Sequence, residues 1–192
     1  QNHVQSAQPP KTATGVSSRT ALAPGYNMVS APYKTGGMIP VAVFGGWADW
    51  AWFWLSTSNV SPDTSGNWVW PQSVDPGEGI FVWSYNDTTM LKTGVTATND
   101  AAGITVTLVP GWNIVSNHQL TNMTSISTTW MIDGVTQLGT AVGGTIGNTI
   151  YYWEPTLSNY VSWLILSNPK IEPWKSYMIL NNTGVNHTLT IK

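Results

Sequence analysis

The sequence predicts an all-β protein with two tandem, repeat-related β-sandwich-like modules, or one sandwich built from both, preceded by an extended N-terminal arm. The first observation is an internal repeat: residues 22–30 (LAPGYNMVS) return as residues 108–116 (LVPGWNIVS), with six of nine positions identical. The second is the alternation of apolar residues with threonine in residues 104–108 and 187–191, which is typical of strands with one buried face.

A second pair of segments supports the duplication. Residues 76–83 (PGEGIFVW) correspond to residues 173–180 (PWKSYMIL), and the aromatic runs at 52–54 and 151–153 also look equivalent. We therefore expect an arm over residues 1–21, a first module over 22–107 and a second module over 108–192. The second copy is longer by about eleven residues, which we place in its polar region, 121–147.

The arm and the remaining strands follow from local composition. Residues 1–21 are polar and contain Pro9-Pro10, so in isolation they should be extended. Such an arm can add to an exposed sheet edge of a neighbouring copy through main-chain hydrogen bonds. Only residues 124–132 are a candidate for a short helix. Further strands are expected in the β-branched and aromatic runs at 67–70, 80–83, 150–153, 160–163 and 177–180.

The repeated motifs also carry a resemblance. Segments 25–30 and 111–116 share a Gly-aromatic-Asn-x-x-Ser pattern, and each copy ends in a proline turn followed by an apolar strand. This combination resembles a family of extracellular bacterial and archaeal surface-protein repeats that open with Gly-Trp-Asn-x-x-Ser, with Tyr26 and Ser176 as departures. The resemblance implies a scaffold unit of secreted or surface proteins, including subunits of archaeal-type extracellular filaments. The resemblance implies no catalytic residue in this chain.

Charge is scarce in this chain. Charged residues make up 8% of it, against roughly 25% in an average soluble domain. The net charge of -2, without any run of Lys or Arg, excludes nucleic-acid binding. The chain begins with Gln1 and has no cysteine, so we expect a mature exported protein, secreted or on the cell surface, without disulfides. The apolar stretch at 38–55 is interrupted by Pro40 and Asp49, so no membrane span is expected.

Something other than charge must keep such a chain dispersed: glycans, burial in an assembly, or a setting such as acid or high salt. Glycans have candidate attachment points in the Asn-x-Ser/Thr sequons. The five sequons are at Asn59, Asn86, Asn122, Asn181 and Asn186.

The chain contains twelve tryptophans, with a dense group in the first copy. At the period of a strand, Trp50, Trp52 and Trp54 would share one face. With Trp47 they would form an aromatic strip that serves core packing, an inter-subunit contact or stacking against a glycan.

No catalytic or metal-binding set is evident. The nine carboxylates are scattered, the three histidines are far apart in sequence, and only a cleft with Asp49, Glu154 and Glu172 is conceivable. We therefore expect neither an enzyme nor a cofactor or metal. By contrast, Asn27 and Asn113 follow the same Pro-Gly turn, and we expect both side chains to be buried and bonded to the main chain of their own module.

These observations favour a structural subunit of an extracellular filament or surface layer, which polymerises through docking of its N-terminal arm and through aromatic contacts. Its expected partners are other copies of itself and, in addition, surface glycans. The alternative is a carbohydrate-binding or adhesion module that uses an exposed Trp strip.

Overall fold

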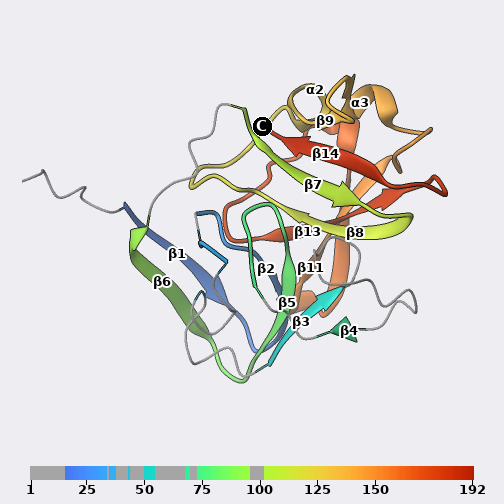
Figure 1. Ribbon diagram of the computed structural model, residues 1–192. Coiled ribbons are helices and arrows are strands. Elements are labelled where there is room, and N and C mark those ends of the chain that lie inside the picture. The colour runs from blue at the N-terminus through green and yellow to red at the C-terminus, as the bar shows by residue number, and fades with distance from the viewer. Residues whose placement is uncertain are drawn as a thin grey trace, which may run out of the picture.

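The computed structural model of this chain describes residues 16–33, 35–37, 43, 50–54, 68–69, 73–95 and 102–192. These residues form antiparallel strands in one two-stranded and three four-stranded sheets, with a few short helices. The predicted all-β fold is confirmed. In Figure 1 the ribbon and helices of the second copy lie at the upper right, whereas the first copy runs across the lower part, from β1 and β6 at the left to β4 at the right.

The first copy contains a four-stranded sheet and a two-stranded ribbon. The sheet has the order β2-β5-β3-β4, and the ribbon pairs β1 with β6. Because β1 pairs with β6 of its own chain from Val16 onward, the segment predicted as an arm is already part of a sheet over its last residues. The strands are β1 (Val16–Leu22), β2 (Gly25–Val29), β3 (Trp50–Trp54), β4 (Trp68–Val69), β5 (Ile80–Ser84) and β6 (Thr88–Val95).

The second copy repeats this arrangement, and it is described from β7 onward, because β7 pairs with β14 although it starts four residues before the expected boundary at 108. Its sheet has the order β8-β13-β11-β12, the counterpart of β2-β5-β3-β4, and β7 pairs with β14 as β1 does with β6. Its strands are β7 (Ile104–Leu108), β8 (Gly111–Ser116), β11 (Thr149–Glu154), β12 (Asn159–Leu164), β13 (Ser176–Asn181) and β14 (His187–Ile191).

The strand register confirms that the duplication is structural. Asn27 lies opposite Val82, and Asn113 lies opposite Ile179. The aromatic runs correspond as well: Trp52 is opposite Phe81 and Tyr151 is opposite Met178, which are equivalent positions of the two closing strands.

The extra residues of the second copy lie where the sequence predicted them. The longer segment between β8 and β11 contains α2 (Ile126–Thr129), β9 (Met131–Ile132), β10 (Thr136–Gln137) and α3 (Leu138–Ala141). Strand β9 pairs with β14, so the ribbon of this copy grows into a four-stranded sheet, β10-β9-β14-β7. Short 3-10 turns, η1 (Pro155–Leu157) and η2 (Ile165–Ser167), flank β12.

The cores of the two copies interpenetrate. Met28 and Phe81 of the first copy are buried in a cluster composed otherwise of second-copy residues. Trp174 of the second copy is 1% exposed and completes the cluster of the first copy. Neither core is complete without a side chain from the other copy.

Reciprocal hydrogen bonds join the copies at the ends of β2 and β8. The Ser30 N–H donates to the carbonyl of Trp174 at 2.8 Å, and its hydroxyl donates to that of Lys175 at 3.2 Å. At the equivalent place, the Ser116 hydroxyl donates to the carbonyl of Glu78 at 2.9 Å. The opening strand of each copy therefore contacts the closing turn of the other, and the two modules pack as a pseudo-symmetric pair.

Candidate functional site

Asn27 and Asn113 organise the same turn in both copies, as predicted. Their side chains are 4% and 0% exposed. Each Oδ1 accepts a main-chain N–H four residues earlier, from Ala23 at 3.2 Å and from Val109 at 2.9 Å. Each Nδ2 donates back to the carbonyl of that same residue, at 2.9 Å in both copies.

The glycine before each asparagine completes the motif. The two Nδ2 groups donate a second bond to the carbonyls of Gly25 and Gly111, at 3.0 and 2.8 Å. These glycines have φ values of 97° and 93°, which a residue with a Cβ rarely adopts. The Gly-aromatic-Asn motif is therefore a structural element that fixes the entry to β2 and β8.

The five sequons differ in accessibility. Asn86, Asn122 and Asn186 are exposed, whereas Asn59 lies outside the described residues. Asn181 is 1% exposed, and its Nδ2 donates to the carbonyls of Leu108 at 3.2 Å and of Val185 at 2.9 Å. A glycan on Asn181 does not fit this structure, because the nitrogen that would carry it is buried and already bonded.

The tryptophan strip is a strand over part of its length. Trp50, Trp52 and Trp54 occupy every second position of the strand β3, as predicted. Trp50 lies opposite Trp83 of β5. Trp47 and the side chains of the strip lie outside the described part of the structure. Whether the strip serves the core, a contact or a glycan thus remains a prediction.

Strand β12 forms a sheet edge that the sequence analysis did not single out. It pairs on one side with β11 over all six of its residues, and it ends the order β12-β11-β13-β8. Its burial pattern is exposed at every position except Val161, which is half-buried. From Pro155 to Pro169 the chain carries no Asp, Glu, Lys or Arg.

Large apolar side chains gather around this edge. Nine such side chains are exposed among the described residues, and five of them lie in β12 or in the turns that flank it. These five, with their exposed fractions, are Leu157 (64%), Tyr160 (42%), Trp163 (40%), Leu164 (57%) and Leu166 (60%). A signal was available in the sequence, since apolar residues without neighbouring charges are unusual on an exposed strand.

Aromatic residues of both copies also lie at the boundary between them. The indole Nε1–H of Trp153 donates to the carbonyl of Tyr26 at 2.9 Å. Trp153 contacts Tyr160 at a ring-centroid distance of 5.1 Å and an interplanar angle of 74°, and Tyr26 contacts Trp83 at 4.8 Å and 82°. Because neighbouring rings are nearly perpendicular, these residues do not form a flat platform.

The closing turns of the copies differ in charge. In the second copy Lys175 pairs with Glu172, and Lys170 pairs with the same carboxylate. Partial burial would raise the pKa of Glu172, but the hydrogen bonds from the two lysines hold it below its ordinary value. In the first copy both equivalent residues are acidic: Glu78 lies beside Asp75, and burial, reinforced by that second carboxylate, raises the pKa of Glu78 to about 7.

These contacts also concern the cleft that the sequence analysis considered between Asp49, Glu154 and Glu172. Glu172 is held by its lysines, and the Glu154 carboxylate accepts the hydroxyl of Thr156 at 2.9 Å. Asp49 lies outside the described residues. Each of the two described carboxylates therefore has a local structural role.

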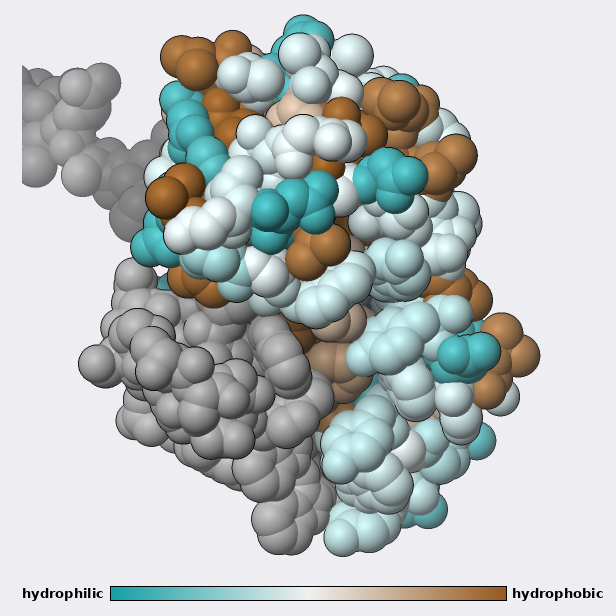
Figure 2. Space-filling model, turned by 90° about the vertical axis from the view of Figure 1, so that its right-hand side faces the viewer, coloured by the Kyte–Doolittle hydropathy of each residue, from teal (hydrophilic) through white to brown (hydrophobic). Residues whose placement is uncertain are grey.

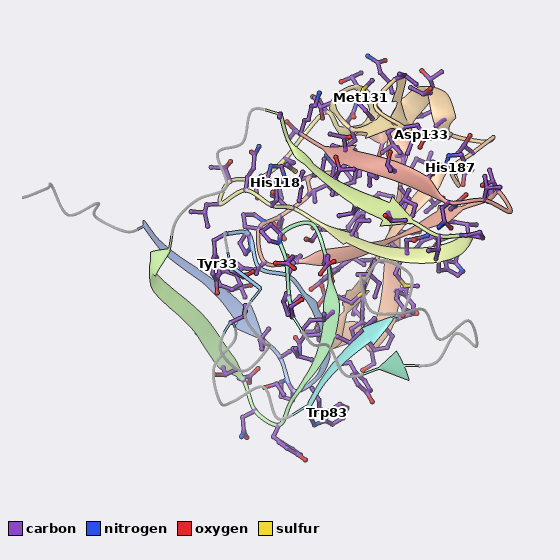
Figure 3. All side chains as sticks on the ribbon, viewed as in Figure 1. Tyr33, Trp83, His118, Met131, Asp133 and His187 are labelled. Carbon is purple, nitrogen blue, oxygen red and sulfur yellow. The ribbon has the colours of Figure 1, made fainter. Side chains whose placement is uncertain are left out.

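One polar network was not expected from the sequence. His187 Nδ1 lies 2.7 Å from Asp133 Oδ2, and its Nε2 lies 3.0 Å from the hydroxyl of Thr183, which is the connectivity of a nucleophile, base and acid. Figure 3 shows Asp133 and His187 close together at the upper right. Because Asp133 is 54 positions from His187, only the fold could bring them together.

The surroundings favour a structural role for this network. The Thr183 hydroxyl also donates to Asn181 Oδ1 at 2.8 Å, an acceptor nearer than the imidazole. Asp133 accepts the main-chain N–H of Thr188 at 2.8 Å, and this bond, with that from His187, holds the pKa of Asp133 below its ordinary value. We interpret this network as a structural contact that holds the turn after β13 against the β9–β10 hairpin.

In the part of the chain that the structure describes, no cluster of His, Asp or Glu side chains is suited to hold a metal ion. No described helix is long and apolar enough to cross a membrane. Comparisons with protein-family models, curated proteins and solved structures give no match. The resemblance to the surface-protein repeats therefore stays a prediction from the two motifs.

Proposed function

We propose that this protein is a structural subunit of an extracellular filament or surface layer, and that it polymerises when the N-terminal arm of one copy pairs with the β12 edge of the next. The observation that carries the proposal is the edge of β12, which pairs with no strand on its outer side among the described residues. Soluble proteins normally guard an edge strand with charged residues, proline, a bulge or a covering segment. The strand Asn159–Leu164 has no charged residue and no proline, and its register with β11 is regular.

The arm has the properties of a partner for this edge. Residues 1–15 would span about 50 Å if fully extended, which exceeds the radius of gyration of about 16 Å expected for a domain of this size. Their one charged residue is Lys11. The six residues His3–Gln8 precede Pro9 and match the length of β12, so they can donate and accept along a ladder that Pro9 would end.

The position of β1 favours a contact between molecules. Strand β1 begins at the left of Figure 1, whereas β11, the neighbour of β12, lies in the right half. A contact between two different surfaces of identical subunits is heterologous, and it builds an open chain unless the rotation closes a ring. Such a chain is a filament.

The surface composition supports an assembled state. On the side of the molecule that faces the viewer in Figure 2, strongly hydrophilic residues are separated by wide areas of intermediate hydropathy and by apolar patches. Burial of part of this surface between copies would compensate for the low charge of the chain.

The donor segment can be tested by deletion and by proline substitution. Removal of residues 1–14 should give a folded monomer, because β1 stays intact. Gln5→Pro should shorten filaments in electron micrographs, since proline removes a main-chain donor, whereas the matched Gln5→Ala should not. Long filaments from the deleted chain would contradict the proposal.

The acceptor can be tested separately. Ser162→Lys places a charge in the exposed edge strand and should abolish assembly with little change in thermal stability. Val135→Lys is the matched control, because Val135 is 80% exposed and lies far from β12 in sequence. If both variants assemble equally well, β12 is not the acceptor, even if the arm deletion blocks assembly.

A carbohydrate-binding or adhesion module is the second candidate, and the exposed aromatic residues are the observation in its favour. Stacking on a sugar prefers accessible ring faces, which the perpendicular ring pairs described above do not supply as a flat row. Retardation of the monomer by soluble polysaccharides, lost in Trp52→Ala, would make this the leading function.

A further inference from the structure

The turn between β5 and β6 combines an exposed asparagine with an exposed tyrosine that lies beside a half-buried tryptophan. The Ser84 hydroxyl donates to the carbonyl of Asn86 at 2.8 Å, which holds the turn in place. Tyr85 is 62% exposed, and its ring lies 6.4 Å from that of Trp83 at an interplanar angle of 77°. Trp83 is half-buried and lies at the lower end of the molecule in Figure 3.

Asn86 differs from the other exposed sequons in this respect. Asn122 and Asn186 have no Phe, Trp or Tyr within three positions on either side, whereas Asn86 directly follows Tyr85 and lies three residues after Trp83. Thr88, the third residue of the sequon, is half-buried at the start of β6. Asn86 itself is exposed at the tip of the turn.

From this arrangement we propose that Asn86 carries an N-linked glycan whose first sugar packs on the exposed ring of Tyr85. The C–H groups of a pyranose carry a slight positive charge and form an apolar face, which complements the negative face of an aromatic ring. A sugar on Asn86 would cover Tyr85, the most exposed aromatic residue among those that the structure describes, and it would add polar surface to a chain poor in charge.

The modification requires a separate glycosyltransferase and a sugar donor activated as a lipid-linked phosphate or diphosphate ester. The Nδ2 of Asn86 attacks the anomeric carbon, and a C–N bond forms while the bond between that carbon and the phosphate oxygen breaks. The phosphate leaves with the electron pair, and the amide proton passes to a base of the transferase. The inference depends on the exported location proposed above, but it does not depend on polymerisation.

The attachment is tested by mass spectrometry of protease-generated peptides that contain residues 85–92 of the native protein. We expect these peptides to carry a hexose or N-acetylhexosamine increment, which Asn86→Gln and Thr88→Ala abolish and Thr88→Ser retains. Native peptides found only at their unmodified mass would overturn the proposal, whether or not electron microscopy shows filaments.

The packing of the sugar is tested by a double-mutant cycle. In protein that retains Tyr85, the melting temperature of the glycosylated form should be about 2–4 °C above that of the Asn86→Gln variant. This is the difference expected for one additional favourable contact in a chain of this size. In the Tyr85→Ala background this difference should fall to less than half. The control is the same comparison for Asn122→Gln, which Tyr85→Ala should not affect. An equal difference with and without Tyr85 would show that the sugar does not pack on the ring.

Discussion

At the scale of single residues, Asn113 shows how one side chain can fix a turn. Its amide accepts one main-chain N–H and donates to two carbonyls, at 2.8 to 2.9 Å, and it is fully buried. Removal of the amide would leave these groups without partners inside the protein, where water cannot replace them.

We therefore expect Asn113→Ala to lower the free energy of unfolding by about 1–3 kcal/mol. Asn113→Asp should cost at least as much, because a carboxylate keeps the acceptor but faces two carbonyls without a donor. Urea unfolding of the two variants, with the exposed Asn122→Ala as control, measures the effect. A loss at Asn113 no larger than that at Asn122 would contradict the structural role of this motif.

A second residue-scale prediction concerns Glu78. Burial raises the pKa of its carboxyl group from 4.5 to about 7, and the charge of Asp75 raises it further. The native state then holds a proton at pH 5–7 that the unfolded chain releases, so the unfolding free energy falls as the pH rises. The stabilisation is fully present below about pH 4.5 and lost through about pH 7, and a shift of this size corresponds to about 3 kcal/mol.

Glu78→Gln should remove this dependence, because glutamine stays neutral and can still accept the main-chain N–H of Asp75. The difference in unfolding free energy between variant and native protein should therefore grow from pH 4.5 to pH 8. Glu172→Gln is the control of opposite sign, since the pKa of Glu172 is lowered and its stabilisation is lost as the pH falls. Parallel curves for Glu78→Gln and the native protein would exclude an ionisation coupled to folding.

At the scale of elements, the turns that precede β5 and β13 connect the copies. The first copy uses Gly77, with φ 91°, and the second uses Trp174, with φ 67°, at the equivalent position. A bulky residue in the left-handed region costs about 1–2 kcal/mol. The burial of Trp174 in the first core offsets this cost, because a large aromatic side chain fills the space between the copies.

The positive φ of the buried Trp174 predicts an unusual order of stability among variants at this position. Trp174→Ala should lower the unfolding free energy by about 3–5 kcal/mol through the cavity it leaves. Trp174→Gly should be less damaging than Trp174→Ala by about 1 kcal/mol, since glycine has no Cβ penalty at positive φ. The more common order, with glycine below alanine, would show that this backbone conformation is not retained in solution.

At the scale of the whole molecule, the interpenetrating cores make the two copies dependent on each other. Met28 and Phe81 complete the second core and Trp174 the first, while Ser30 and Ser116 bond across the boundary. We expect one cooperative thermal transition, with calorimetric and van't Hoff enthalpies in agreement. Two separate transitions, or a stable fragment of residues 102–192, would show that the modules fold independently.

The sequence determined the fold class, the duplication and its turns, because these depend on local signals. Strand periodicity, the Pro-Gly turns and the repeated Asn are readable from neighbouring residues, and the strand register matches the alignment of the two copies. Neither α2 (Ile126–Thr129) nor α3 (Leu138–Ala141) is long enough to show a helical period. Residues 124–132 were nevertheless a candidate for a short helix, which α2 matches, whereas α3 was not expected.

Only the tertiary structure decided how the copies meet and which residues are accessible. Trp174 lies in the core of the first copy, whereas Met28 and Phe81 lie in the core of the second. The pairing of His187 with Asp133 and the burial of Asn181 likewise depend on residues far apart in the chain. The edge position of β12 likewise depends on which strands find partners. Such contacts arise from the packing of complete sheets, and no local pattern of residues encodes them.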